Sequence, residues 1–143
     1  MKETTAQLQD TLTELISLSL IGKQAHWNLR GPQFLEIHEL LDVIVESTRN
    51  FYDDVAERAV ALGTSVSGQA SAVNQSGIKE IPIGFMKDLE AAKEVVNRMG
   101  QVITNIRQRM EESGKTDPVT QDLYIEILRT MEKQFWLLRS HTL

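Results

Sequence analysis

The stretch "KQAHWNLRGPQFLEIHELLD", residues 23 to 42, carries two histidines on either side of a short turn. His26 lies near the end of one helical segment, the Gly-Pro pair of residues 30–32 interrupts the helix, and His38 lies early in the next segment. Asp42 follows His38 by four residues, so the two side chains lie on the same face of a helix. An imidazole and a carboxylate at this spacing can share a divalent ion.

The distribution of glycine and proline around this stretch predicts an all-α fold. These residues cluster at 30–32, 67–84 and 113–118, and the long segments between the clusters lack internal proline. The sequence therefore predicts four helices, at about 4–29, 34–62, 83–112 and 117–140. The 143 residues form one domain, 1–143, of the four-helix-bundle class.

The segment 63–82 is long for a connection within a bundle. We expect it to cross over the length of the bundle, so that the second and third helices run parallel, or to fold a short helix of its own.

Composition limits the chemistry that the chain can perform. Cysteine is absent, which excludes disulfides, thiolate metal sites and cysteine nucleophiles and leaves histidine and carboxylates as metal ligands. The formal net charge is −5, and Lys2 is the only basic residue among the first 22, so there is no basic arm for a phosphate backbone. The N-terminus lacks the pattern of a signal peptide, and no apolar run is long enough for a bilayer, so we expect a cytoplasmic protein without a membrane partner.

A helical wheel of the second helix places an acidic line beside its apolar face. The apolar face spans roughly 120° and contains Phe34, Ile37, Leu41, Ile44, Val45, Thr48, Phe51, Tyr52, Val55, Ala59 and Leu62. The adjoining arc contains His38, Glu39, Asp42, Glu46, Arg49, Asp53 and Glu57, and Asp54 lies outside it. This arc is either a solvated face or a metal-binding face. Asp53 and Glu57 favour the second interpretation, because like charges four residues apart destabilise a helix unless a cation lies between them.

One chain cannot assemble all of these groups. His38 and Glu57 are 19 residues apart, which is about 28 Å along a straight helix. If a second copy of the helix runs antiparallel across a two-fold axis near residues 47 and 48, His38 and Asp42 meet Asp53 and Glu57 of the partner subunit. The spacing thus predicts two equivalent shared sites per dimer. His26 is either a structural histidine or a third ligand, and the ligand types suit iron, manganese or zinc.

The opening stretch, followed by "YDDVAERAVALG" at 52–63 and more loosely by "DLYIEILRTMEKQFWLLRSH" at 122–141, resembles the Dps family of ferritin-like mini-ferritins. The resemblance implies a hollow dodecamer that oxidises Fe(II) with hydrogen peroxide or dioxygen, stores ferric mineral and protects against oxidative damage. It assigns the catalytic and metal-binding roles to His26, His38 and Asp42 of one chain and to Asp53 and Glu57 of its partner, with two iron ions per site and no haem. The Glu-x-x-His pairs of ordinary ferritins are absent.

The resemblance suggests three further roles, each with a plainer alternative. Tryptophans near the iron centre could quench oxidising equivalents or could be ordinary packing residues: Trp27 and Trp136. Acidic residues of the second helix could nucleate mineral or could simply be solvated: Glu39 and Glu46. Acidic residues of the fourth helix resemble the lining of iron-entry pores: Asp117, Asp122 and Glu126. Asp117 also suits a helix N-cap beside Pro118, and we expect His141 to be disordered near the C-terminus.

DNA is the remaining partner to consider. Some family members bind DNA through a lysine-rich N-terminal extension, whereas this chain begins almost at its first helix. Twelve copies would carry a formal charge of about −60, which repels DNA at moderate salt unless cations bridge the two. A DNA-condensing nucleoid protein is therefore the alternative to a ferroxidase, and a plain bundle with a solvated acidic face is the third hypothesis.

Overall fold

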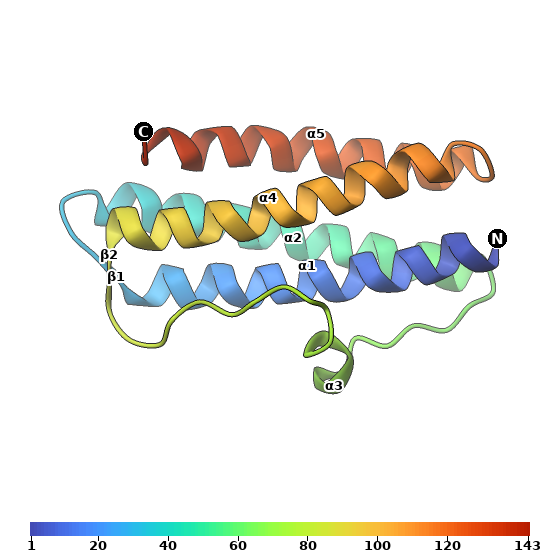
Figure 1. The fold of residues 1–143 in the computed structure, drawn as a ribbon, viewed down its shortest axis with the longest axis horizontal. Helices are drawn as coiled ribbons and strands as arrows, with labels where there is room; N and C mark the ends of the chain where they lie inside the picture. Colours follow the sequence, from blue (N-terminus) through green and yellow to red (C-terminus); the bar gives the residue numbers. More distant parts are fainter.

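The computed structural model describes residues 1–143, and four long helices make up most of it (Figure 1). The long helices are α1 (Lys2–Asn28), α2 (Phe34–Ala61), α4 (Asp88–Ser113) and α5 (Pro118–Ser140). The short elements are α3 (Ala70–Val73), β1 (Leu29–Arg30) and β2 (Met86–Lys87). The predicted all-α bundle with a long crossover and a short helix within it is confirmed.

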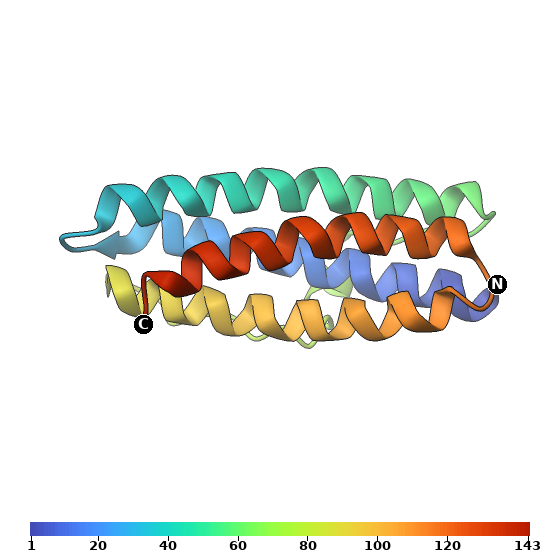
Figure 2. The same cartoon turned by 90° about the horizontal axis from the view of Figure 1, so that it is seen from above.

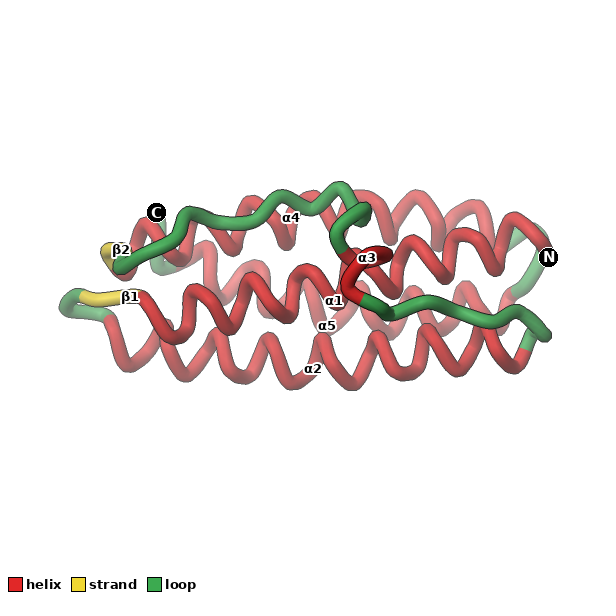
Figure 3. The backbone as a smooth tube through the Cα atoms, turned by 90° about the horizontal axis from the view of Figure 1, so that it is seen from below, coloured by secondary structure: helices red, strands yellow, loops and turns green.

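The crossover explains the directions of the helices. α1 and α2 run antiparallel and pack closely, as do α4 and α5 (Figures 1 and 2). Between these pairs the chain returns along the outside of α1, with α3 partway along it, before α4 begins (Figure 3). α2 and α4 therefore run in the same direction, as the long connection predicted.

Side chains of α1 and α4 hold the crossover in place. The Gln9 amide accepts the Ser67 N–H at 2.9 Å and donates to the Ser67 carbonyl at 2.8 Å. The buried guanidinium of Arg98 donates to the carbonyls of Lys79 and Glu80, each at 2.9 Å, and pairs with Glu94. These bonds satisfy backbone groups that have no partner in a helix.

The turn between α1 and α2 is tied to the start of α4. β1 and β2 form a parallel pair in which Leu29 faces Met86. The buried carboxylate of Asp88 accepts the Gln33 N–H at 2.6 Å. Gly31 has φ +141°, and a Cβ at this position would lie 2.6 Å from the Asp88 carboxyl carbon. This packing gives a reason for α4 to begin at Asp88. The predicted start, at about residue 83, was five residues too early.

Most buried side chains of the bundle are apolar, and one buried ionic cluster lies between α1 and α4. Large, fully buried side chains come from all four long helices and include Leu15, Ile44, Met99 and Ile127. The buried carboxylate of Glu14 pairs with Arg109 and accepts the Asn105 amide at 2.6 Å. The charge of Glu14 is thus neutralised by a guanidinium of the same chain.

The C-terminal end is ordered, contrary to the sequence expectation. His141 Nδ1 donates to the Gln33 amide oxygen at 2.9 Å, which joins the end of α5 to the turn before α2. None of the helices combines the length and the apolar character needed to cross a membrane.

Candidate metal centre

Two histidines form a stacked pair where the end of α1 meets the beginning of α2. The His26 side chain is only 8% exposed, and its ring stacks on that of His38 with 3.6 Å between centroids and 11° between planes. His26 Nδ1 bonds to the His38 carbonyl at 2.7 Å, and His38 Nδ1 bonds to the His26 carbonyl at 2.8 Å. The Phe34 ring stacks against His38 at 4.8 Å.

This reciprocal bonding decides which nitrogen of each ring is free. A carbonyl oxygen only accepts hydrogen bonds, so each Nδ1 must carry the proton. In its neutral form each ring therefore keeps its lone pair on Nε2, and this is the form that binds a metal ion. Two imidazoles of fixed orientation are available as donors.

Asp42 lies one helical turn beyond His38 and is also close to His26. Its side chain is 54% exposed, and its Oδ1 is paired with Lys23 Nζ from α1. The hydrogen bond from Lys23 is the main effect that lowers the pKa of Asp42, desolvation opposes it, and the charge of Lys23 lowers the pKa further. Asp42 is therefore an anionic donor beside the two imidazoles.

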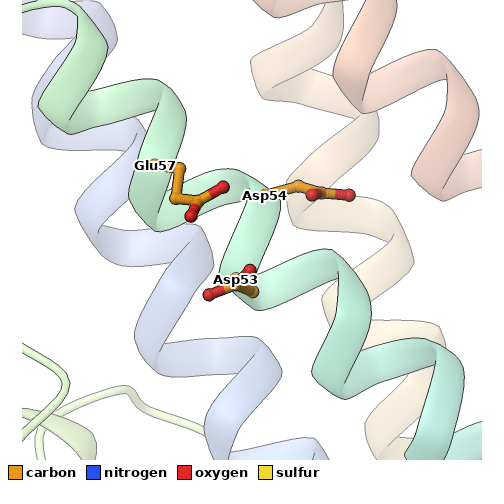
Figure 4. A group of neighbouring side chains, drawn as sticks. All are labelled: Asp53, Asp54 and Glu57. Atoms are coloured by element: carbon orange, nitrogen blue, oxygen red, sulfur yellow. The ribbon is translucent and has the colours of Figure 1, made fainter.

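A second group of carboxylates lies further along α2. Oxygen atoms of Asp53, Asp54 and Glu57 all lie within 4.8 Å of one another, and the three side chains are exposed (Figure 4). Sequence reasoning set Asp54 aside because it lies outside the acidic arc. The signal that could have found it is its three-residue spacing from Glu57, which makes the two side chains neighbours on a helix.

The structure brings the predicted ligands together as two separate half-sites. One half-site contains His26, His38 and Asp42, and the other half-site contains Asp53, Asp54 and Glu57. α2 is unbroken between Phe34 and Ala61, which keeps His38 and Glu57 about 28 Å apart. Imidazoles and carboxylates are donors that suit Fe(II) and other first-row divalent ions, so both half-sites fit such an ion.

The additional residues named from the sequence have varied surroundings. Trp27 and Trp136 are 66% and 62% exposed, so neither is a core aromatic of the isolated chain. Glu39 and Glu46 are exposed on α2. Exposed acidic residues of α5, Asp122 and Glu126, line a shallow groove together with Asp54 and Glu57 of α2.

Asp117 lies at the predicted helix boundary, and its carboxylate is bound by side chains. It stands at the N-cap position of α5, but its side chain caps no backbone N–H. Its Oδ2 instead accepts Arg58 Nη2 at 2.8 Å and the Thr120 hydroxyl, and the residue is buried. The carboxylate is thus enclosed by partners of its own chain, and an iron-entry role for Asp117 stays a prediction.

Comparison with known proteins identifies a matching family, similar sequences and a similar solved structure. The sequence profile of the ferritin-like domain matches residues 5–142. The "DNA protection during starvation protein" of Agrobacterium fabrum is 37% identical over 94% of this chain and 84% of its own length. The "DNA protection during starvation protein 2" of Deinococcus radiodurans is 39% identical over 98% of this chain, which spans 58% of that relative. The crystal structure of Dps92 from Deinococcus radiodurans superposes with a TM-score of 0.94, at 38% identity over 97% of this chain and 85% of the other.

Proposed function

Because this chain belongs to the Dps family of ferritin-like proteins, we propose that it is a ferroxidase that oxidises Fe(II) at sites shared by two subunits and stores the ferric product in a hollow shell. The observation that carries the proposal is the stacked pair of His26 and His38, whose Nε2 lone pairs are left free beside the anionic Asp42. This bonding favours cation binding over a role in packing alone, because it leaves both Nε2 atoms free.

The register of α2 supports the sharing of each site. Across a two-fold axis near residues 47 and 48, His38 of one subunit lies opposite Glu57 of the partner subunit, and Asp42 lies opposite Asp53 of the partner subunit. Both pairings use the same axis, so one antiparallel contact completes two equivalent sites. Each site then combines two imidazoles with carboxylates that offset the charge of two ferrous ions.

The reaction is a two-electron reduction of peroxide. Two Fe(II) ions each give one electron to one hydrogen peroxide molecule, whose O–O bond breaks, and water supplies the remaining oxygen of the hydrated ferric product while protons are released. Dioxygen is the alternative oxidant. Removal of Fe(II) and peroxide together suppresses hydroxyl-radical chemistry, so we expect a protective role in the cytoplasm.

The test is co-elution of iron with the assembled protein. Anaerobic Fe(II) is added, then peroxide, and ferric absorbance is followed through size-exclusion chromatography with light scattering. We expect ferric absorbance to travel with a particle near twelve subunits, and we expect initial oxidation rates to fall at least tenfold in His38→Ala and Asp53→Ala. Glu111→Ala removes an exposed carboxylate of α4 and should oxidise iron at the parent rate. Parent rates in both site variants, with assembly intact, would contradict the assignment.

A second candidate function follows from the name of the two relatives, which refers to DNA protection. Iron and peroxide removal protects DNA without contact, whereas direct condensation requires binding to phosphates against the formal charge of −5 per chain. A gel-shift series separates the two. Direct binding predicts complexes that weaken steeply with salt and persist in His38→Ala, and protection without contact predicts no shift at moderate salt.

A further inference from the structure

Two opposite charges in the middle of α2 have no partner within the subunit. Arg49 is exposed, and it forms no ion pair with Glu46, three residues before it, or with Asp53, four residues after it. Glu46 is also exposed and forms no ion pair. The other basic residue of α2, Arg58, is engaged by Asp117. Glu46 and Arg49 are therefore free to meet charges from outside the subunit.

The two-fold contact proposed above decides what these side chains meet. If His38 lies opposite Glu57 of the partner subunit, the antiparallel helices bring together residues whose numbers sum to 95. The same register places Glu46 opposite Arg49 of the partner subunit. At 100° per residue, all four of these positions lie within about 50° of the direction that faces the partner. Each acidic side chain thus meets a basic one across the axis.

An apolar pair fits the same register. Leu35 and Val60 are 60% and 57% exposed, although both side chains are apolar. Their numbers also sum to 95, so Leu35 lies opposite Val60 of the partner subunit, one turn beyond each His38. Burial of this pair removes apolar surface from water. Neither the apolar pair nor the charged pair was used to place the axis, and both agree with it.

We propose that Glu46 and Arg49 form two reciprocal ion pairs across the two-fold axis, and that these pairs select the partner and the register of each shared site. The inference rests on the proposed function, because it uses the same axis. The two ion pairs lie about 4.5 Å apart along the helix, so they form one cluster of alternating charge between the two metal centres. Glu46 is thus a residue of assembly and not of mineral nucleation.

The charges also oppose a wrong register. A slip of four residues in one direction places Glu46 opposite Asp53 of the partner subunit. Two carboxylates then face each other without a cation between them, which disfavours that register. In the correct register the carboxylates of Asp42 and of the partner's Asp53 also face each other, but a metal ion lies between them.

The test reverses one charge in each of two variants. Glu46→Arg gives a contact face with two positive charges, and Arg49→Glu gives one with two negative charges. We expect each variant alone to form two-fold pairs at least tenfold more weakly than the parent. In a mixture each positive face meets a negative one, so mixed pairs should rise from the random share of about one half to about nine tenths. Native mass spectrometry of dimers released from remixed shells measures this share.

Two controls show whether the effect belongs to this contact. The chain that carries both Glu46→Arg and Arg49→Glu has complementary charges again, so it should associate like the parent. Lys93→Glu and Glu111→Arg reverse exposed charges of α4, and a mixture of these two variants should pair at random. Circular dichroism on each variant establishes that folded subunits are compared.

The outcomes separate this inference from the proposed function. Anaerobic titration with Co(II), whose visible absorption reports ligand binding without turnover, gives the second readout. Random pairing of Glu46→Arg with Arg49→Glu, in a protein whose parent shell binds Co(II), would overturn the ion pairs alone. Weak association of the chain with both substitutions would overturn them as well. A parent chain that stays monomeric would overturn the shared metal site and the ion pairs together.

Discussion

At the scale of single residues, the structure shows how a buried charge is kept stable at the end of the bundle. Asp117 immediately precedes α5 and accepts hydrogen bonds from Thr120 and from Arg58 of α2. The bond from Thr120, followed by the bond and charge of Arg58, lowers the pKa of Asp117. The carboxylate therefore links two helices only while it is ionised.

This pKa shift predicts an acid-sensitive contribution to stability. A carboxyl group whose pKa is lower in the folded state contributes stability that is full above its unfolded pKa, near 4, and is lost as the pH falls through the folded pKa. We expect Asp117→Asn to reduce the unfolding temperature at neutral pH and to differ less from the wild type near pH 2. Thermal unfolding at one protein concentration across this range checks the prediction. An equal deficit at both pH values would mean that packing, not charge, explains the loss.

At this scale, the sequence predicted which residues lie close together only where their spacing along one helix was sufficient. His38 with Asp42 and Asp53 with Glu57 follow from four-residue spacing within α2. Lys23 was missed because its contact depends on the register between α1 and α2, which no single-helix pattern contains. The stacking of the histidines and their free Nε2 atoms depend on the same register.

At the scale of elements, the register of α1 against α2 depends on the turn that joins them. Gly31 adopts a positive φ and packs against Asp88, which also holds the N–H of Gln33. Residues 29–30 pair with 86–87, so the turn is fixed to the start of α4. Because His26 and His38 lie on either side of this turn, it sets the geometry of the stacked pair.

Gly31→Ala should therefore weaken both stability and metal binding. Its Cβ would meet the Asp88 carboxylate and would require a strained backbone, at a cost of about 1–3 kcal/mol. Gly77→Ala is the matched control, because Gly77 also has a positive φ but faces open space. We expect both variants to unfold at lower temperature and only Gly31→Ala to lose Co(II) affinity. Equal Co(II) affinity in the two variants would show that the turn does not position the histidines.

The crossover gives a second prediction at this scale. Arg98→Ala leaves the carbonyls of Lys79 and Glu80 without their donor, which should destabilise the segment by about 1–3 kcal/mol. We expect faster amide hydrogen exchange across residues 67–84 and unchanged exchange in the middle of α2, which serves as an internal reference. Exchange that rises equally in both regions would indicate global destabilisation instead.

Element boundaries were predictable where local signals end a helix. Pro118 and the Gly-Pro turn at 31–32 mark such boundaries, and the predicted ends there are close to the observed ones. The start of α4 was not predictable in this way, because residues 86–87 are extended by pairing with a segment that is more than fifty residues away in sequence. Tertiary contacts decided that boundary.

At the scale of the whole molecule, the length of α2 makes assembly a requirement of the proposed chemistry. Both half-sites have ligands on the unbroken helix α2, where His38 and Glu57 are about 28 Å apart, so no flexing of a folded subunit can bring the two groups together. A shared site therefore makes a prediction that an internal site does not: two inactive variants should complement each other.

Co-expressed His38→Ala and Asp53→Ala subunits provide this test. In a two-fold pair with one subunit of each kind, one site receives His38 and Asp53 intact, and the other receives neither. Random mixing then restores about one quarter of all sites, and ferroxidase rates per subunit should recover in proportion. The control is wild type co-expressed with subunits that carry both substitutions. If the sites are shared, about one quarter of them again stay intact, whereas if each site lies within one chain, about one half stay intact. No recovery in the first mixture, together with half activity in the second, would place the whole site inside a single subunit.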